Sequence, residues 1–221
     1  MTESHTAPRE MTVDFVADVV CPWCYLGWVR MKKTFDLRPG VTPVIRWRPY
    51  QLNPELPEEG VDRATLMAAK FGADPERLSA MQGNLERAAA EDGLELKFGQ
   101  IDWSPNTNAA HRLIVWAQQE GKGAEAAEAV MRAYWTELRD IGDPLVLADI
   151  GAALGMDRDT LVQRYADGAG KDFVNQACEQ AQRSGVQGVP FMIFDGKVAV
   201  SGAHAPQELV RAIDKALEEA A

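Results

Sequence analysis

The hydrophobic pattern divides the chain into three regions. The first begins with a short apolar run rich in Val and Phe, Met11 to Val20, which predicts a buried strand. A helix-like segment from Tyr25 to Phe35 follows and ends at the breakers of residues 38–40. Partial alternation from Val41 to Trp47 predicts a second strand. We expect the two strands to pair in parallel through a right-handed crossover helix, as a βαβ unit.

The second region, residues 61–166, has almost no strand pattern. Apolar residues recur at helical spacing at Ala110, Leu113, Ile114 and Ala117, and again from Ala127 to Leu138. Further helices are predicted over Asp62 to Phe71, Pro75 to Glu91, Leu145 to Leu154 and Asp157 to Tyr165. A helical stretch of roughly a hundred residues is large enough for one compact subdomain.

The third region returns to mixed character. A helix is predicted over Lys171 to Ser184, then a strand over Phe191 to Phe194. Asp195 and Gly196 form a strong two-residue hairpin signal before the partner strand, and a helix over Pro206 to Glu219 closes the chain. We therefore expect an α/β fold in which residues 11–60 and 167–221 form one domain, residues 61–166 form an insertion, and residues 1–10 form a disordered leader.

Two cysteines stand at the junction between the first predicted strand and its helix. Cys21 and Cys24 are separated by Pro22 and Trp23, and Cys21 falls near the helix N-terminus. Unpaired N–H groups and the helix dipole stabilise an anion there, which favours the reactive thiolate. Cys24 lies one turn further on, close enough to form a disulfide with Cys21 or to resolve a mixed one. Pro22 suits a first turn because it has no N–H.

Composition and charge narrow the range of partners and compartments. The 221 residues carry a net charge of −10 with no basic stripe, which argues against nucleic acid and anionic membrane surfaces. The first ten residues lack the layout of a signal peptide, and no apolar run is long enough to span a membrane. We expect a cytoplasmic protein, in which a disulfide would be transient and catalytic. Three cysteines also argue against a structural disulfide framework.

The chain resembles the DsbA-like family of thioredoxin-fold oxidoreductases, in particular its FrnE-like branch. That branch is related to 2-hydroxychromene-2-carboxylate isomerases and kappa-class glutathione transferases. Four motifs in the expected order carry the resemblance: residues 18–27 (DVVCPWCYLG), 47–54 (WRPYQLNP), 106–112 (NTNAAHR) and 188–194 (GVPFMIF). Together they cover nearly the whole chain after residue 10. The resemblance implies a thioredoxin fold with an inserted all-helical subdomain.

Several site residues follow from the resemblance. It implies that Cys21 is the nucleophile, that Cys24 is the resolving thiol, and that Pro190 is the cis-proline of the fold. The backbone of Val189 would then lie beside Cys21, ready to pair with an extended substrate segment. Trp23 is expected to be exposed for substrate contact.

Other substrate contacts are predicted at Pro22, within the motif, and at Asn53 and Arg48. Asn53 lies in a Pro-rich loop where the isomerase branch has a substrate-contacting Asn-Pro pair, although Asn is also an ordinary turn residue.

Departures from the related enzymes favour thiol exchange. The isomerases and the kappa-class transferases have serine where this chain has Cys21. The transferases hold the γ-glutamyl end of glutathione with a Ser-Asp pair, which residues 202–204 (Gly-Ala-His) replace here. Trp23 stands where DsbA itself has histidine, which predicts a less oxidising couple than that of DsbA.

The proton of Cys24 needs an acceptor. Many thioredoxins have a buried Asp six residues before the first cysteine, and this chain has Phe15 there. Asp18 or a water molecule is therefore expected to take that proton. A zinc site is the alternative use of a Cys-x-x-Cys pair, but the sequence offers no second Cys or His pair, so we expect no metal.

Several single residues have two interpretations each. Cys178, on an apolar stripe, is either buried and inert or reactive, as a third redox thiol or in an intermolecular disulfide. His111 is expected on a helix surface or at a cap rather than in catalysis. His204 either caps the last helix or contacts the edge of a pocket. Three tryptophans are expected in the core of the insertion: Trp103, Trp116 and Trp135.

Two functions fit these observations. The first is a thiol–disulfide oxidoreductase that acts on protein or small-molecule disulfides, with a thiol reductant as electron donor. It needs no cofactor beyond its own redox-active disulfide, and glutathione is a candidate co-substrate. The alternative is a glutathione-assisted isomerase of an aromatic or polyketide intermediate, in which the insertion covers a pocket and Asn53 and Arg48 hold the substrate. A homodimer is compatible with the resemblance, but the sequence shows no dimer patch.

Overall fold

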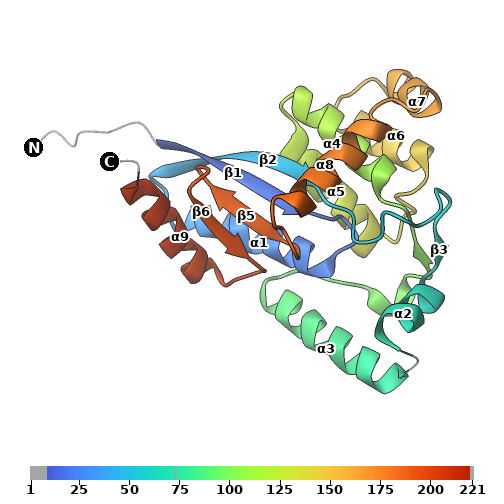
Figure 1. The fold of residues 1–221 in the computed structure, drawn as a ribbon, viewed down its shortest axis with the longest axis horizontal. Coiled ribbons are helices and arrows are strands. Elements are labelled where there is room, and N and C mark those ends of the chain that lie inside the picture. The colour runs from blue at the N-terminus through green and yellow to red at the C-terminus, as the bar shows by residue number, and fades with distance from the viewer. Residues whose placement is uncertain (1–8, 73, 220–221) are drawn as a thin grey trace, which may run out of the picture.

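A computed structural model describes residues 9–72 and 74–219 (Figure 1). The strands are β1 (Arg9–Ala17), β2 (Val41–Pro49), β3 (Val61–Asp62), β4 (Trp103–Ser104), β5 (Phe191–Phe194) and β6 (Val198–Ser201). The helices are α1 (Pro22–Asp36), α2 (Arg63–Phe71), α3 (Pro75–Glu91), α4 (Asn108–Gln119), α5 (Gly123–Trp135), α6 (Pro144–Ala153), α7 (Arg158–Ala166), α8 (Lys171–Arg183) and α9 (Pro206–Glu218), with a short 3-10 helix at Phe98–Gln100.

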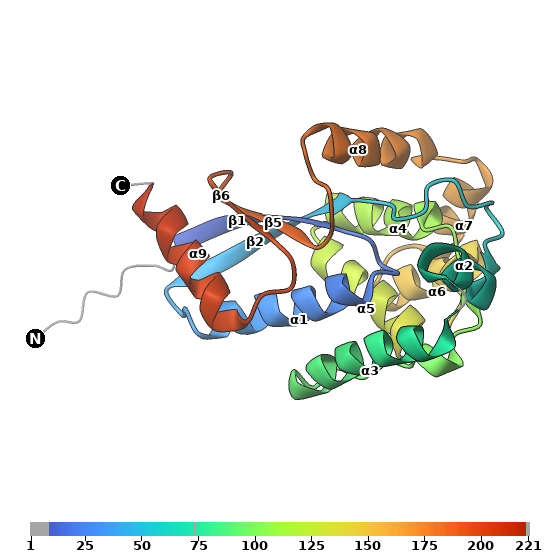
Figure 2. The same ribbon diagram turned by 60° about the horizontal axis from the view of Figure 1, so that its bottom comes forward.

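The four-stranded sheet has the order β2-β1-β5-β6. Strands β1 and β2 pair in parallel through α1, and β5 and β6 form the antiparallel hairpin predicted from Asp195 and Gly196. Figure 2 shows α1 and α8 on opposite sides of this sheet, with α9 beside α1. The expected α/β fold of the thioredoxin kind is confirmed.

Aromatic side chains fill the layer between the sheet and α1. Phe15 packs edge-on against Trp28 and stacks on Trp47, with ring centroids 5.3 and 5.9 Å apart respectively. All three side chains are buried, and burying an aromatic side chain of this size contributes a large share of core stability. Phe15 is therefore an apolar core residue in the place where a thioredoxin acid would stand.

The opposite face of β1 carries an ionic cluster. The carboxylate of Asp14 accepts hydrogen bonds from Arg46 Nη2 at 2.8 Å and from Arg48 Nε at 2.7 Å. Both arginines lie on β2, two residues apart and therefore on the same face of the strand. The cluster fixes the register of the two strands, because a slip by one residue would turn both arginines to the other face.

Hydrogen bonds from side chains join the helical region to the sheet and its active helix. Trp135 Nε1 on α5 donates to the carbonyl of Val19 at 3.2 Å, and the amide of Trp47 donates to Gln118 Oε1 on α4 at 2.7 Å. One buried cluster runs through both parts of the molecule. The boundaries at residues 61 and 166 stay a prediction. Among the described residues, no helix is both long enough and apolar enough to cross a bilayer.

Three expectations need correction. Residues 61–166 do contain strand, because β3 and β4 pair in antiparallel. Trp103 lies on β4 with 41% of its surface exposed, and its indole donates to Glu59 O, whereas Trp116 and Trp135 are buried as predicted. Residues 1–8 of the expected leader lie outside the described residues. Its last two residues belong to β1, since the amide of Arg9 donates to Gly40 O and Arg9 pairs with Val41.

Candidate active site around Cys21 and Cys24

The dithiol lies where β1 leads into α1. Cys21 is the N-cap residue of α1, with Pro22 in the first turn as predicted. The amide of Cys21 donates to the carbonyl of Asp18, which forms the tight turn between strand and helix. No side chain caps this helix; Pro22 has no N–H and the amides of Cys24 and Tyr25 donate to Cys21 O, which leaves the amide of Trp23 as the first-turn donor beside the Cys21 side chain. This position favours negative charge on Cys21 Sγ.

The two thiols differ in their surroundings. Both are free; Cys21 is 5% exposed, and Cys24 is wholly buried behind it. Cys21 Sγ lies 3.8 Å from the carbonyl oxygen of Val189, which comes from the segment just before β5. Burial, and next the neighbouring Cys21, raise the pKa of Cys24 well above its ordinary value. Cys24 is therefore a protonated thiol at neutral pH, and Cys21 is the sulfur nearer to solvent.

A shallow groove of about 320 Å³ adjoins the dithiol. Trp23, 47% exposed, forms one side, and Val189 and Pro190 lie in the same groove. The Val189–Pro190 bond is cis, and the amide of Gly202 donates to Pro190 O. His204 lies at the edge, where its ring nitrogens contact Ser201 O and Glu208 Oε2. The structure thus brings the predicted contacts Pro22, Trp23 and Val189 together at Cys21.

A buried polar pair lies behind the motif. Asp18 is 1% exposed, and its Oδ2 accepts the amide of Leu52 at 2.8 Å. His111 lies beside it, with Nε2 3.4 Å from Asp18 Oδ1 and 3.0 Å from Tyr50 O. Trp47 Nε1 points at His111 Nδ1 at 3.1 Å. An indole N–H can only donate, so Nδ1 is unprotonated and the ring hydrogen of the neutral imidazole lies on Nε2.

The prediction that His111 lies on a helix surface is wrong. Its side chain is fully buried, because α4 turns this face towards β2 and the aromatic cluster. The signal that could have found it is its position three residues before Ile114, which places the two side chains on the same face of α4. A polar side chain at such a position needs buried partners, and the carbonyl of Tyr50 and the indole of Trp47 supply them.

Arg48 and Asn53 lie apart from this arrangement. Arg48 is held by Asp14 on the sheet face that α8 covers. Asn53 closes a turn, since its carbonyl accepts the amide of Leu56, and its side-chain Oδ1 is buried without a partner among the described residues. The turn interpretation of Asn53 is thus supported. Its contact with substrate stays a prediction.

Cys178 is buried on α8, with its Sγ 4.0 Å from Gln51 Oε1. Burial raises its pKa to about 12. Among the described residues, no group of three or more His, Cys, Asp and Glu side chains is placed to hold a metal ion. Cys178 has the surroundings of an inert core thiol.

The raised thiol pKa values predict alkaline destabilisation of the reduced protein. In the unfolded chain both thiols ionise near their ordinary pKa of about 8.5, whereas Cys24 and Cys178 keep their protons in the folded state. Their contribution is fully present below that pH and is lost as pH rises, by up to about 1.4 kcal/mol per pH unit for each thiol. Urea denaturation between pH 7 and pH 10 measures the slope. Cys178→Ala should make it shallower; an unchanged slope would contradict the assignment.

The fold and the site together define a thioredoxin-fold protein of the thiol oxidoreductase type. The family model described as the DsbA-like thioredoxin domain matches residues 12–214, and the chain belongs to this family. The match includes the dithiol, the helical region and the β5–β6 hairpin.

Solved structures agree with this assignment. A probable DsbA oxidoreductase from Streptomyces coelicolor is 29% identical, with a TM-score of 0.84 over 95% of this chain and 91% of its own. A 2-hydroxychromene-2-carboxylate isomerase is 21% identical (TM-score 0.69; 95% and 97% covered). The cytosolic disulfide reductase DsbM from Pseudomonas aeruginosa, solved with GSH, is 17% identical (TM-score 0.59; 95% and 97% covered). The fold is therefore shared by redox proteins and an isomerase.

Proposed function

We propose that this protein is a thiol–disulfide oxidoreductase that uses Cys21 and Cys24 on protein or small-molecule disulfides. The observation that carries the proposal is the asymmetry of the dithiol. Cys21 lies at the N-terminus of α1 beside an exposed aromatic residue and the backbone of Val189, whereas Cys24 is buried and protonated behind it. One sulfur is placed to attack and the other to resolve.

The exchange proceeds in two displacements. The Cys21 thiolate attacks one sulfur of the substrate disulfide, a mixed disulfide forms, and the other substrate sulfur leaves as a thiolate that takes up a proton. Cys24 then loses its proton and attacks Cys21 Sγ, so that the first substrate sulfur leaves. Two electrons have passed to the substrate, and the protein holds a Cys21–Cys24 disulfide. Two equivalents of a thiol reductant return it to the dithiol.

Asp18 is the proposed proton acceptor for Cys24, directly or through a water. It is the buried carboxylate behind the motif, close enough that its charge helps to raise the Cys24 pKa. Asp18→Asn keeps the shape and the acceptor for the Leu52 amide but removes the base. We expect resolution of a preformed mixed disulfide to slow by roughly tenfold to a hundredfold near pH 7 and to recover as pH rises. An unaltered pH profile would show that Asp18 takes no part.

The substrate, donor and compartment belong to the same proposal. The groove with exposed Trp23 suits an extended peptide or a small disulfide, which could pair with the backbone of Val189. Glutathione is the proposed reductant, since the structural neighbour DsbM was solved with GSH and is named a cytosolic disulfide reductase. This chemistry needs no bound cofactor or metal, and we propose that it takes place in the cytoplasm. A homodimer is compatible with the same chemistry.

The equilibrium reduction potential of the dithiol is the first experiment. Trp23 lies within the motif, so its fluorescence should follow the redox state in glutathione buffers. We expect one reversible two-electron couple closer to the thioredoxin value of about −270 mV than to the DsbA value of about −120 mV. The absence of a reversible couple would overturn the proposal.

Glutathione-assisted isomerisation is the second candidate. It is favoured by the isomerase among the structural neighbours and by the buried Oδ1 of Asn53, which has no partner within residues 9–72 and 74–219. Isomerisation transfers no net electrons, so it does not require a second thiol. Isomerase activity that needs glutathione and survives Cys24→Ser would support it.

A further inference from the structure

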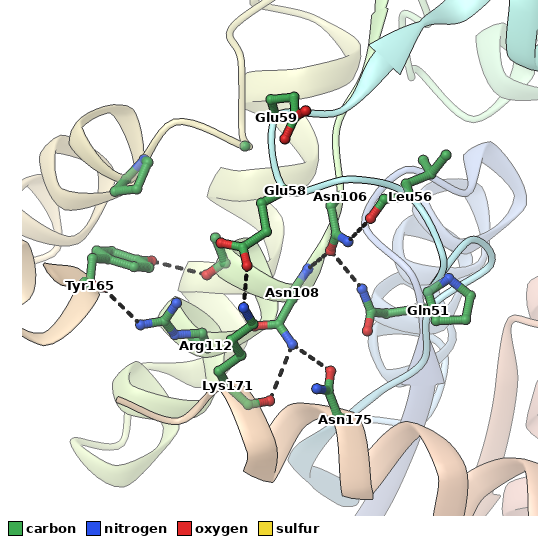
Figure 3. A pocket seen from close by; sticks show the side chains of 14 residues that line it. Gln51, Leu56, Glu58, Glu59, Asn106, Asn108, Arg112, Tyr165, Lys171 and Asn175 are labelled. Atoms are coloured by element: carbon green, nitrogen blue, oxygen red, sulfur yellow. Dashed lines mark hydrogen bonds and ion pairs between the residues drawn. The ribbon is translucent and has the colours of Figure 1, made fainter. Parts of the chain in front are cut away.

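A second polar cavity, of about 480 Å³, lies on the helical side of the molecule (Figure 3). It is bounded by the loop of residues 51–59 and by the first turns of α4 and α8. No residue of the Cys21–Cys24 motif or of the groove beside it lines this cavity. Its volume is within the usual range of small-molecule sites, about 300–1,000 Å³. Amide and charged side chains line most of it: Gln51, Asn106, Asn108, Arg112, Lys171 and Asn175.

A buried arginine forms one wall of the cavity. Arg112 is 7% exposed, and its Nε donates to the carbonyl of Ala169 at 2.6 Å while Nη2 donates to that of Arg164 at 3.2 Å. The rings of Trp116 and Tyr165 flank the guanidinium at 5.3 and 4.9 Å. Its hydrogen-bond partners among the described residues are thus carbonyls. The charge of Glu58 acts on the guanidinium, but no carboxylate of these residues lies within ion-pair distance of it, and Nη1 makes no hydrogen bond to them. A buried charge of this kind is normally paired with an opposite one.

Two helix N-termini add to the positive potential. The first turns of α4 and α8 both line the cavity, and neither N-cap residue, Thr107 or Gly170, caps its helix with a side chain. Asn106 Oδ1 accepts the amide of Asn108 in α4, and the carbonyl of Gly168 accepts the amide of Lys171 in α8. The remaining first-turn N–H groups favour an anion. Lys171, on α8, brings a further positive charge into the cavity.

The same cavity also contains one unsatisfied acceptor. Asn108 is buried, and its Nδ2 donates to the carbonyl of Lys171 and to Asn175 Oδ1, which fixes the orientation of the amide (Figure 3). Its Oδ1 is buried with no partner among the described residues, so it requires a hydrogen-bond donor. Glu58, which pairs with Lys171, and Glu59 add two carboxylates to the lining.

We propose that this cavity binds the α-amino-acid group of a small molecule. The carboxylate of the ligand lies against Arg112 and Lys171, and its ammonium donates to Asn108 Oδ1 and Glu58. Two cationic and two acidic side chains line the cavity, so its net charge is near zero, and a zwitterion complements it better than an inorganic anion does. The proposal is independent of the dithiol chemistry, since the two sites share no residue.

Isothermal titration calorimetry with each standard L-amino acid in turn tests the proposal. We expect saturable binding of at least one of them. The analogue of that amino acid without its α-amino group, and the analogue without its carboxylate, should each bind at least about tenfold more weakly, because each loses a charge-assisted hydrogen bond. The proposal is overturned if no amino acid binds, if the deaminated analogue binds equally well, or if inorganic phosphate binds in preference.

Substitutions of the lining residues test whether the amino acid binds in this cavity. Lys171→Met and Glu58→Gln each remove one side of an ion pair at the cavity and should weaken binding. Lys32→Met is the matched control, because it breaks a comparable lysine–glutamate pair, with Glu128 outside the cavity, and should leave binding unchanged. Arg112→Lys should also weaken binding. If that variant does not fold, the affinities of Lys171→Met and Glu58→Gln decide whether the ligand binds in this cavity. Cys21→Ser should bind normally, so that failure of the dithiol proposal leaves this one standing.

Discussion

Replacing Cys21 with serine is expected to lower disulfide turnover by roughly three orders of magnitude or more. A serine hydroxyl does not ionise near neutral pH and cannot form a disulfide, so the first displacement is lost. The substitution is nearly isosteric at an N-cap position where serine is a favoured residue, so the fold should be retained. Reduction of a small aromatic disulfide, followed by absorbance with excess glutathione, measures the loss.

Replacing Cys24 with serine has a different expected result. Attack by Cys21 is preserved, but nothing resolves the product, so a mixed disulfide between Cys21 and the substrate should accumulate and appear as a mass increase in non-reducing mass spectrometry. Cys178→Ser is the control. This variant removes a thiol whose burial raises its pKa to about 12. It should turn over substrate as fast as the parent protein, and like the parent it should trap no mixed disulfide. Full activity of Cys21→Ser would sink the proposed mechanism.

Trp47→Ala is expected to cost about 3–5 kcal/mol of folding stability, the usual range for removing a buried tryptophan. Trp47 is 2% exposed, stacks on Phe15, and lies with its ring centroid 6.2 Å from that of Trp28. Its removal opens a large void between the sheet and α1. Since whole domains are typically stable by only about 5–15 kcal/mol, the urea midpoint should fall sharply.

Two further tryptophan variants separate the contribution of the Trp47 hydrogen bond from that of its packing in the core. Trp47→Phe keeps an aromatic ring but removes the N–H that donates to His111 Nδ1, so a buried acceptor is left unpaired at a cost of about 1–3 kcal/mol. Trp103→Ala, at an exposed position, should cost less than about 1 kcal/mol. Equal losses at positions 47 and 103 would contradict the assignment of Trp47 to the core.

Local patterns predicted the thioredoxin-like part because its elements are defined by local chemistry. The strand-to-helix junction at Cys21 follows from an apolar run, a proline and a helical stripe. The hairpin follows from Asp195 and Gly196, both of which have positive φ in the structure. These residues determine their own backbone conformation, so neighbouring residues suffice to predict them.

What the sequence did not reveal depends on contacts between distant segments. His111 is buried because Trp47, far away in the chain, supplies a hydrogen bond to its ring. Trp103 is exposed because a two-residue strand pair, too short to leave a periodic pattern, holds it at the surface. The polar cavity at Arg112 likewise lies between the loop of residues 51–59 and the first turns of α4 and α8, which are far apart in the chain, so no local sequence pattern predicts it.

The ionic cluster of Asp14, Arg46 and Arg48 limits which substitutions the chain can accept at these three positions. A neutral residue at position 14 would leave two guanidinium groups side by side on one face of β2 with no counter-charge between them. Substitutions at the three positions are therefore not independent. Among related sequences, loss of the acid at 14 should occur together with loss of a positive charge at 46 or 48, and an aligned family would show this as covariation between two adjacent parallel strands.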